Sequence, residues 1–493
     1  MKQVVLFEIL VFMCLVVSAQ SGKRGMAYGH HSPQDLSVLS PEISWWYNWS
    51  EVPESSVANV FEDYGFEFVP MTWNGQFNES KLRNYLKDHP QTKYLLAFNE
   101  PNFLDQANMK PSEVAAQWPR LEAIASEFNL EIVAPAVNFC GECVSENGTV
   151  YTDPFQYLDD FFAACPDCRV DHIAVHSYMN TVSALEWYIG EFKKYGKPIW
   201  LTEFAGWEYN GNINNVNDQI SFMIGAVDLL ENDPDVFRYA WFIGRGSGIQ
   251  TFPYIDLLGA NGTLTQLGKV YKQMPTHDKN QVVAVPATIE AEAYNSMSGI
   301  LLEKTLDNSG FANVGYIDAG DWLEYKIEVT EAGSYDLRLR VASTKNTSLQ
   351  VLVDGEVKLT QSIANTNGWQ NWLTLNSALT LDAGVQTLRV RAVSDGFNFN
   401  WMAIGNVATA SDDFPNRNLE LEVFPNPGSG IFELRTDRNV DKLQVFNLTG
   451  TPVRTLEFAR TIDLSELPSG MFILKAMDKT GTMLATERIV IRR

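Results

Sequence analysis

Short apolar runs alternate with longer amphipathic stretches over residues 22–275 of the chain. Eight of the runs have the length and composition of buried strands. They are Gly25–Tyr28, Ile43–Tyr47, Phe66–Met71, Tyr94–Phe98, Ile132–Ala136, His172–His176, Ile199–Thr202 and Arg238–Phe242. Helical patterns lie between them, at 80–88, 110–128, 154–164, 181–195 and 217–231. Strands that alternate with helices form parallel sheets, and eight such units in about 255 residues predict an α/β fold, a (β/α)8 TIM barrel.

Beyond residue 283 the hydrophobic positions follow a period of two that Gly and Asn interrupt. Runs such as Leu323–Val329, Ser334–Val341 and Val385–Arg391 predict antiparallel strands. We therefore expect an antiparallel β-sandwich over 283–406, after the barrel domain at 20–277. A polar stretch at 407–418 indicates a linker, and the short strands of 419–493 predict a small C-terminal β-sandwich.

The N-terminus has the pattern of a secretory signal peptide over residues 1–19. Lys2 precedes an apolar run from Val4 to Val17, and the small residues Ser18 and Ala19 follow it. This run is too short for a transmembrane helix of about 20 apolar residues, and no later segment reaches that length. We therefore expect an exported protein without a membrane span.

Four cysteines beyond the signal peptide form two C-x-x-C pairs, Cys140 with Cys143 and Cys165 with Cys168. In an exported protein an even number of cysteines favours disulfides, and four cysteines allow three connectivities. A structural zinc site with four thiolates is the alternative, because paired C-x-x-C knuckles also bind this metal.

Composition and charge narrow the class of partner. Hydrophobic residues make up 45% of the 493, which excludes a disordered chain. The 37 Lys and Arg against 60 Asp and Glu give a formal charge of −23, which disfavours nucleic-acid binding. Neutral polymers such as polysaccharides remain possible partners.

Two glutamates follow predicted strands of the barrel. The fourth strand ends in Asn99-Glu100-Pro101-Asn102 and the seventh in Thr202-Glu203-Phe204. The active site of a (β/α)8 barrel lies at these strand ends, and hydrolysis of a glycosidic bond needs a pair of carboxyl groups. A single such Glu could be a solvated surface residue, but two behind buried runs favour catalysis.

Aromatic and polar residues at the other strand ends are typical of a sugar pocket. They are His30, His31, Trp45, Trp46, Trp49, Trp73, Asn74, Asn138, His176, Tyr178 and Trp241. Aromatic faces match the C–H faces of pyranose rings, while Asn, His and Tyr bind hydroxyls. Each Trp could equally belong to the core. Because no H-E-x-x-H, P-loop or G-x-G-x-x-G pattern occurs, we expect catalysis without a cofactor.

Three stretches of the first domain resemble glycoside hydrolase family 128, a family of β-1,3-glucanases on a (β/α)8 barrel. They are Leu96-Ala97-Phe98-Asn99-Glu100-Pro101-Asn102, Val170-Asp171-His172-Ile173-Ala174-Val175-His176-Ser177-Tyr178 and Trp200-Leu201-Thr202-Glu203-Phe204-Ala205. The resemblance implies a retaining mechanism with Glu100 as general acid/base and Glu203 as nucleophile. It further implies that Asn99 holds the 2-hydroxyl and that Tyr178 orients Glu203. Ser177 departs from the family pattern, which has Trp there, and this leaves the fine specificity open.

The middle domain resembles carbohydrate-binding modules of family 6. The resemblance lies in Ile289-Glu290-Ala291-Glu292-Ala293-Tyr294, Gly315-Tyr316-Ile317-Asp318-Ala319-Gly320-Asp321-Trp322 and Phe397-Asn398-Phe399-Asn400-Trp401. It implies a sugar ring between Tyr316 and Trp369 with a hydrogen bond from Asn398, for which Asn400 is the alternative. It also places Glu290 and Glu292 at the positions of structural calcium ligands, and calcium prefers carboxylate oxygens. The other interpretation of these two glutamates is a solvated strand face.

The last domain resembles the C-terminal sorting domain of type IX secretion. The resemblance lies in Phe424-Pro425-Asn426-Pro427, Leu467-Pro468-Ser469-Gly470 and the terminal basic strand. It implies export to the outside or the surface of the cell by that machinery. A further adhesive β-domain without an address role is the alternative.

Together these patterns predict a monomeric, secreted endo-β-1,3-glucanase that acts on a β-glucan polysaccharide of the laminarin or curdlan type. In this hypothesis Asn102, Trp45, Trp73, Asn138, His176 and Trp241 join Asn99 and Tyr178 in binding the substrate. Two alternatives remain, a glycoside hydrolase for another β-linked polysaccharide and a catalytically inactive polysaccharide-binding surface protein.

Overall fold

A computed structural model describes residues 21–207, 211–246, 254–260, 262–406, 421–424, 430–436, 440–447, 452–468, 470–479 and 483–491. The chain divides into two compact units, Met1–Asn406 and Val407–Arg493. The expected signal peptide at 1–19 and the whole of the expected linker at 407–418 lie outside the described residues, as do residues 425–427 and 469 of the quoted sorting-domain stretches.

The first unit begins with parallel strands that match the eight predicted runs. These strands are β1 (Arg24–Ala27), β2 (Trp45–Tyr47), β3 (Glu67–Phe68), β4 (Tyr94–Leu96), β5 (Glu131–Val133), β8 (Ile173–Ser177), β9 (Ile199–Phe204) and β10 (Val236–Phe242). A short hairpin of β6 (Ser145–Glu146) and β7 (Thr149–Val150) follows β5. All six residues of β9 are buried, as a strand covered on both faces requires.

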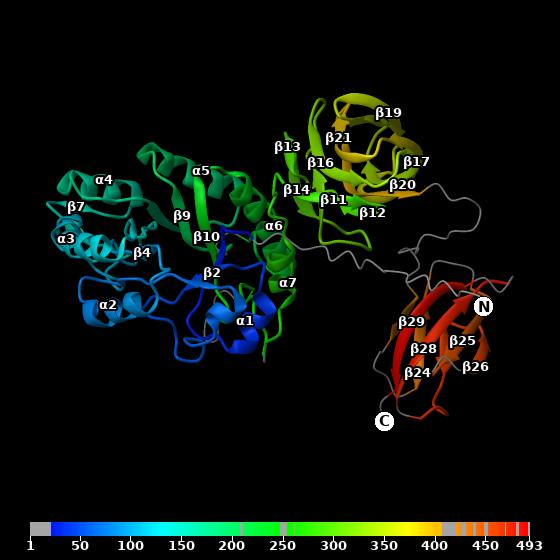
Figure 1. Cartoon of the computed structure of the whole chain (residues 1–493), viewed down its shortest axis with the longest axis horizontal. Helices are drawn as coiled ribbons and strands as arrows, with labels where there is room; N and C mark the ends of the chain where they lie inside the picture. Colours follow the sequence, from blue (N-terminus) through cyan, green and yellow to red (C-terminus); the bar gives the residue numbers. More distant parts are fainter. Residues whose placement is uncertain are drawn as a thin grey trace, which may run out of the picture. The chain divides into compact units, whose positions relative to one another are not determined.

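The helices lie outside these strands (Figure 1). They are α1 (Pro33–Leu39), α2 (Glu79–Asp88), α3 (Pro111–Phe128), α4 (Pro154–Ala164), α5 (Val182–Phe192), α6 (Val216–Asn232) and α7 (Gln266–Gln273), with 3-10 turns η1 (Phe61–Tyr64) and η2 (Lys193–Tyr195). Most begin at a side chain that caps the backbone, such as Asn78 before α2, Asp153 before α4 and Thr181 before α5. These caps fix where each helix starts after its strand.

The strands form one sheet of six in the order β3-β2-β1-β10-β9-β8, and β4 with β5 forms a separate parallel pair. The structure therefore differs from the expected continuous eight-stranded sheet. Isolated parallel bridges lie on both sides of the pair: Met71 bridges to Leu96, and Val133 bridges to His172. The short β3 and β4 leave too few paired residues for continuous ladders at these places.

Large aromatic side chains fill the interior between the strands. Trp45, Trp200 and Tyr94 pack edge-to-face with ring centroids 5.1 Å apart for Trp45 and Trp200 and for Tyr94 and Trp200. The guanidinium of Arg238 lies 4.8 Å from the ring centroid of Tyr94 and 4.9 Å from that of Trp200. These residues lie near the starts of their strands, so they close the end of the domain opposite the strand ends.

The rest of the first unit is built of two six-stranded sheets. Its strands are β11 (Val282–Val285), β12 (Ala287–Glu290), β13 (Ser296–Ser298), β14 (Leu301–Lys304), β15 (Ala312–Gly315), β16 (Trp322–Val329), β17 (Gly333–Ser343), β18 (Thr347–Val353), β19 (Glu356–Ile363), β20 (Gly368–Leu381), β21 (Gly384–Ala392) and β22 (Phe397–Asn406). One sheet has the order β11-β16-β21-β18-β19 with β13 on β16, and the other β14-β15-β22-β17-β20 with β12 on β22. Alternate residues of β16 and β21 are buried, which is the pattern of sheets with one inner face.

The α/β domain and the β domain of the first unit share a buried polar contact. The hydroxyl of Tyr294 donates to Asp228 on α6 over 2.6 Å, and a ring nitrogen of His277 lies 2.9 Å from the same carboxylate oxygen. The His277 and Tyr294 rings stack at 4.0 Å. Burial and the Asp228 charge hold the pKa of Tyr294 well above its usual range, so its hydroxyl stays a donor.

The second unit consists of two small antiparallel sheets. Its strands are β23 (Glu422–Phe424), β24 (Ile431–Arg435), β25 (Lys442–Phe446), β26 (Pro452–Glu457), β27 (Thr461–Asp463), β28 (Gly470–Met477) and β29 (Met483–Ile491). The sheets have the orders β23-β24-β27 and β26-β25-β28-β29. Phe432, Leu443, Leu474 and Ile489 belong to their common core.

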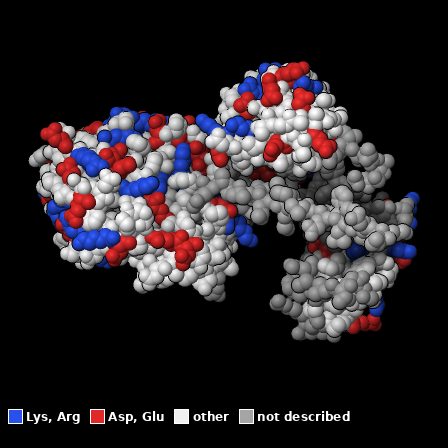
Figure 2. Space-filling model, in the orientation of Figure 1, with Lys and Arg blue, Asp and Glu red and all other residues white. Residues whose placement is uncertain are grey.

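Charged side chains of both signs are interspersed over the visible face of the α/β domain (Figure 2). On this face the acidic side chains therefore do not gather into a single patch. Among the helices in the described part of the chain, none is both long and apolar enough to span a membrane.

Candidate active site

The ends of β4 and β9 bring Glu100 and Glu203 together around one histidine. Nδ1 of His176, on β8, lies 3.0 Å from Oε1 of Glu100 and 3.4 Å from Oε2 of Glu203. The two carboxylate oxygens can therefore be no more than 6.4 Å apart, the sum of 3.0 and 3.4 Å. Both side chains are largely buried, with 12% and 6% of their surfaces exposed.

The backbone at Glu100 adopts the left-handed conformation, with a φ of 42°. A residue with a Cβ pays roughly 1–3 kcal/mol for such a conformation, so its surroundings must hold it there. Two hydrogen bonds do so: the amide of Asn99 donates to the carbonyl of Trp73, and the amide of Glu100 to that of Ala136, both over 2.9 Å. The segments that follow β3 and β5 thus hold the Glu100 backbone, and its carboxyl lines the pocket.

Three donors surround the Glu203 carboxylate. Oε1 accepts hydrogen bonds of 2.8 Å from the hydroxyl of Tyr47 and from the indole Nε1 of Trp49. Oε2 accepts a short hydrogen bond from the hydroxyl of Tyr178. An ionised carboxylate is an acceptor only, so this set of partners suits its charged form and fixes its orientation.

The titration of the neighbouring groups reflects the two carboxylates. Burial lowers the pKa of His176, but the charges of Glu203 and Glu100 and the hydrogen bond to Glu100 outweigh it, so the pKa is raised. Burial and the Glu203 charge raise the pKa of both Tyr47 and Tyr178 well above the usual range. Both phenols therefore remain hydrogen-bond donors at neutral pH.

Amide side chains flank Glu100. Nδ2 of Asn138 lies 3.4 Å from Oε1 of Glu100. Asn99 donates to Gln106 over 3.2 Å, while its own Oδ1 is buried without a hydrogen-bond partner among the described residues. A buried acceptor of this kind on a pocket wall is suited to a hydroxyl of a ligand.

These groups open into a pocket of about 610 Å³, within the size range of small-molecule sites. Its lining combines aromatic rings with amides and the two glutamates. The residues are Trp49, Trp73, Asn99, Glu100, Phe103, Gln106, Asn138, Phe139, Tyr178, Glu203, Trp207 and Phe242.

Three residues expected to bind substrate lie elsewhere. Trp45 and Trp241 are fully buried, and their indole nitrogens donate to the carbonyls of Lys23 and Ile255. Asn102 is also fully buried, and its Nδ2 donates to the carbonyls of Asn138 and Tyr151. None of the three belongs to the pocket lining. His176, which was also expected to bind substrate, is fully buried and outside the lining as well, although it contacts both glutamates of the pocket.

Two residues of the site that the sequence pattern did not mark are Tyr47 and Phe242, the last residues of β2 and β10. Tyr47 contacts Glu203 and Phe242 lines the pocket, whereas the expected Trp45 begins its strand and Trp241 points to the outer core. Taking the final residue of each predicted strand would have found both. Phe103, Gln106, Phe139 and Trp207 lie in loops, where no periodic signal marks them.

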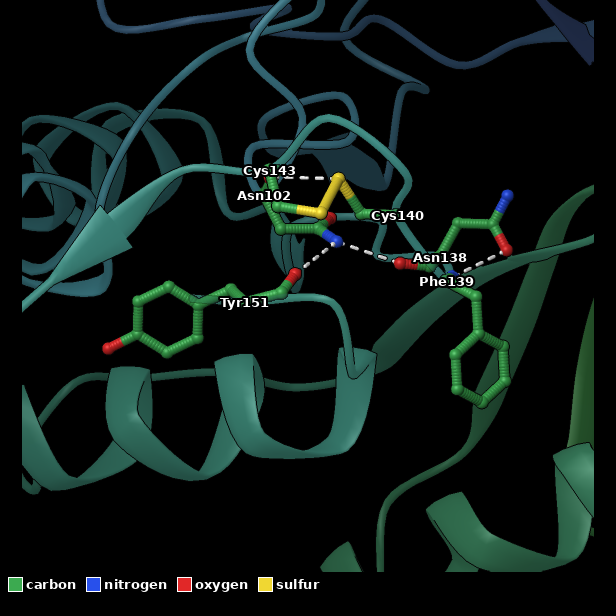
Figure 3. Close-up of a disulfide and its surroundings, with 6 residues drawn as sticks. All are labelled: Asn102, Asn138, Phe139, Cys140, Cys143 and Tyr151. Atoms are coloured by element: carbon green, nitrogen blue, oxygen red, sulfur yellow. Dashed lines mark hydrogen bonds between the residues drawn. A yellow bond between two sulfur atoms is a disulfide. The ribbon is translucent and has the colours of Figure 1, made fainter. Parts of the chain in front are cut away.

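The two cysteines of each C-x-x-C pair form a disulfide with each other. Cys140 is bonded to Cys143 and Cys165 to Cys168, with Cα atoms 5.6 and 5.3 Å apart. The expectation of two disulfides is confirmed, and the four sulfurs are thereby not available as zinc thiolates. Figure 3 shows the first disulfide in the loop that carries Asn138 and Phe139, beside Asn102.

The residues expected to bind sugar in the β domain lie on, or directly after, strands of the same sheet. Tyr316 follows β15 and Trp369 lies on β20, with 66% and 47% of their surfaces exposed. Asn398 on β22 donates to the carbonyl of Trp369 over 2.9 Å and to Glu303 over 2.6 Å. Asn400 is fully buried and donates instead to Asp307.

The expected calcium ligands are an acidic pair at the start of the β domain, in which Glu292 is buried and Glu290 is half-buried. Burial and the neighbouring charge of Glu290 raise the pKa of Glu292 well above its usual range. Oε2 of Glu292 and Oδ1 of Asn400 are buried, and neither has a hydrogen-bond partner in the part of the chain that the structure describes. Among the described residues, no group of three or more His, Cys, Asp or Glu is placed to hold a metal ion.

Three family models match successive parts of the sequence. The glycosyl hydrolase catalytic core matches residues 25–271, the carbohydrate binding module of family 6 residues 290–406, and the secretion system C-terminal sorting domain residues 422–492. The third match indicates type IX secretion to the cell surface or the extracellular space.

Several known proteins are similar to parts of the chain. Alkali-sensitive linkage protein 1 of Schizosaccharomyces pombe is 28% identical over 269 residues, which cover 52% of this chain and 45% of that protein. The chain spans less than half the length of the curated relatives it matches. A family 128 subgroup II endo-β-1,3-glucanase structure from Pseudomonas viridiflava is 40% identical over 52% of this chain and 99% of its own, with a TM-score of 0.48. A family 6 binding module of Cellvibrio mixtus lichenase 5A, in complex with cellotriose, is 40% identical over 25% of this chain and 99% of its own, with a TM-score of 0.24.

Proposed function

The chain belongs to the family of glycosyl hydrolase catalytic cores, and from this premise we propose that its α/β domain hydrolyses β-1,3-glucan in endo fashion and with retention of configuration. One observation carries the proposal: Glu100 and Glu203, from different strands, meet within reach of His176 in a pocket lined by aromatic rings and amides. Aromatic faces and amides suit a neutral sugar chain, and paired carboxyl groups suit glycosidic cleavage.

Glu203 is the nucleophile in this mechanism. Its carboxylate is held by Tyr47, Trp49 and Tyr178, so one oxygen is oriented to attack the anomeric carbon. Glu100 gives its proton to the leaving oxygen as the glycosidic bond breaks. It then takes a proton from the water that releases the sugar from Glu203. The limit of 6.4 Å between the nearest oxygens fits the separation of about 5–5.5 Å typical of retaining enzymes.

His176 and the amides position substrate and acid in this scheme. His176 contacts both carboxylates and Asn138 contacts Glu100, so these side chains fix Glu100 relative to the leaving oxygen. The buried Oδ1 of Asn99 is suited to accept the 2-hydroxyl of the sugar beside Glu100. Trp73 offers an aromatic face in the same pocket.

The β-1,3 linkage rests on the resemblance of the segments around Glu100, His176 and Glu203 to family 128. Digestion of a panel of β-glucans, mannans and galactans by the full chain, with sizing of the products, tests it. We expect a ladder of β-1,3-linked oligomers from laminarin or curdlan. Release of single glucose units only, or cleavage of another polysaccharide alone, would contradict the proposal.

We also propose that the eight parallel strands close into a (β/α)8 barrel over 20–277. The bridges from Met71 to Leu96 and from Val133 to His172 support this closure, because they join the pair of β4 and β5 to both edges of the six-stranded sheet. For the rest of the chain we propose a signal peptide at 1–19 before the barrel, and after it a β-sandwich module at 283–406, a linker at 407–418 and a sorting domain at 419–493.

The β-sandwich holds the enzyme on its polymer in this proposal, through Tyr316, Trp369 and Asn398. Replacement of Trp369 by alanine removes a half-exposed ring and should weaken binding to insoluble β-1,3-glucan about tenfold, which is about 1.4 kcal/mol. Pull-down with the insoluble polymer measures this loss. Hydrolysis of short soluble oligomers should not change; unchanged binding would remove Trp369 from the sugar site.

Calcium in the module is a separate proposal. The buried oxygens of Glu292 and Asn400 fit a cation that prefers oxygen ligands, with Glu290 beside them. Removal of calcium should lower the melting temperature of the module by several degrees, because an ion at 100 times its Kd adds about 2.7 kcal/mol. Calorimetry of the full chain in calcium and in chelator measures the shift.

The matched control for this experiment is Glu292→Gln, which keeps the shape of the neutral carboxyl. The melting temperature of the Glu292→Gln chain should be the same in calcium and in chelator. A parent chain that melts at the same temperature in calcium and in chelator would contradict the site.

A further inference from the structure

Two half-exposed aromatic rings lie beside one another where the active-site pocket meets the surface. Phe139 lines the pocket and is 41% exposed, and Trp187 on α5 is 49% exposed. Their ring centroids are 6.5 Å apart and their planes differ by 13°, so the rings lie nearly parallel. We call Phe139 and Trp187 the aromatic ledge.

Buried and half-buried rings support the ledge from below. Phe155, at the start of α4, packs edge-on against Phe139 at 5.9 Å and against Trp187 at 6.0 Å. Tyr188 lies 5.7 Å from Phe139 and is fully buried. The ledge is therefore fixed in place by its own packing.

The backbone of Phe139 is clamped on both sides (Figure 3). Asn102 donates to the carbonyl of Asn138 over 2.7 Å, and the amide of Phe139 donates to the Asn138 side chain over 2.8 Å. On the other side Cys140 is bonded to Cys143, and its amide donates to Thr152 over 3.1 Å. A ring held this way loses little freedom on binding a ligand.

Exposure of this kind points to a ligand. Single exposed apolar residues are ordinary, but an exposed aromatic patch that continues the wall of a pocket is typical of a binding surface. Both exposed groups are uncharged rings, so the surface suits the C–H faces of a neutral polymer. Since Phe139 already belongs to the pocket, a chain that leaves the pocket on this side passes over the ledge.

The ledge lies on the side of Glu100. Asn138, the residue before Phe139, contacts Glu100, whereas the partners of Glu203 are Tyr47, Trp49 and Tyr178. In the proposed mechanism the general acid faces the leaving sugar. The ledge therefore adjoins the leaving-group half of the substrate.

We propose that the aromatic ledge is an additional subsite, in which Trp187 stacks on a sugar ring of the leaving-group portion of the same glucan chain. This inference rests on the proposed function. It gives the enzyme a preference for leaving groups long enough to reach from the cleavage site to Trp187.

Cleavage of β-1,3-linked oligomers labelled at the reducing end tests this subsite. In Trp187→Ala, kcat/KM on laminarin should fall about tenfold, whereas the shortest oligomer that the parent cleaves should be cut at the parental rate. Cleavage of longer oligomers should shift toward the labelled end, because long leaving groups no longer gain a contact. Trp187→Phe, which keeps a ring, should retain most of the parental pattern, and Glu191→Ala, on the exposed face of the same helix, all of it.

Other outcomes would overturn the ledge as a subsite. One is an unchanged cleavage position with an unchanged rate on laminarin. Another is an equal loss on all lengths, which would assign Trp187 a purely structural role. A dimer of the parent in sedimentation experiments that dissociates in Trp187→Ala would instead make the ledge a contact between copies. A parent chain that cleaves no β-glucan at all would overturn the proposed function itself.

Discussion

The Glu203→Gln chain should hydrolyse laminarin on the order of 10⁴-fold more slowly than the parent, or worse, because a neutral amide replaces the carboxylate nucleophile. Glutamine is similar in shape, and its amide oxygen can still accept the hydrogen bonds from Tyr47 and Trp49. The pocket should therefore keep its geometry and its affinity for sugar while the chemical step fails. Release of reducing ends from laminarin measures the rate, and calorimetry with a β-1,3-linked oligomer measures the binding.

Glu191→Gln is the control for this experiment. Glu191 is an exposed glutamate on α5, and its replacement makes the same change of charge outside the pocket. It should leave the rate unchanged. A Glu203→Gln chain that cleaves laminarin as fast as the parent would contradict the assigned mechanism.

The Glu100→Ala chain should lose roughly 10²–10⁴-fold in rate on laminarin, the contribution typical of general acid–base catalysis. A substrate with a dinitrophenyl leaving group should distinguish its two roles. Such a leaving group departs without a proton, so glycosylation of Glu203 should stay fast and the covalent intermediate should accumulate. Azide, which needs no general base, should then restore turnover and give a β-glycosyl azide.

Glu142→Ala, at an exposed position in the loop near Glu100, controls for a change of loop structure. It should behave like the parent on both substrates. An equal loss by Glu100→Ala on laminarin and on the dinitrophenyl substrate, without an effect of azide, would remove the acid/base role from Glu100.

The hydrophobic pattern predicted the elements of the first unit well, because buried parallel strands are continuous apolar runs. Each of the eight predicted runs overlaps a strand, and the expected helix at 154–164 has the observed bounds of α4. The pattern could not predict where pairing stops. β3 has only two residues, and an isolated bridge from Met71, which follows β3, to Leu96 on β4 takes the place of a ladder between these strands.

The meeting of Glu100 and Glu203 was predictable, because the carboxyl ends of parallel strands lie at one edge of a sheet. The lining was predictable only in part. Trp45 and Tyr47 are two residues apart, so their side chains point to the same side of β2. Trp45, at the start of the strand, lies among the interior rings, whereas Tyr47, at its end, reaches Glu203. The residue types alone do not tell which of two aromatic residues on the same side of a strand belongs to the core and which to the pocket. The loop residues Phe139 and Trp207 reach the pocket through turns whose course depends on the rest of the fold.

The measurement that tests the central claim most directly is the anomeric configuration of the first product. Proton NMR of laminarin hydrolysis by the full chain, recorded before mutarotation, reports it. Retention through Glu203 and Glu100 predicts that the β-anomer appears first and that the α-anomer follows as the product equilibrates. Initial appearance of the α-anomer would show inversion in a single step and contradict the account.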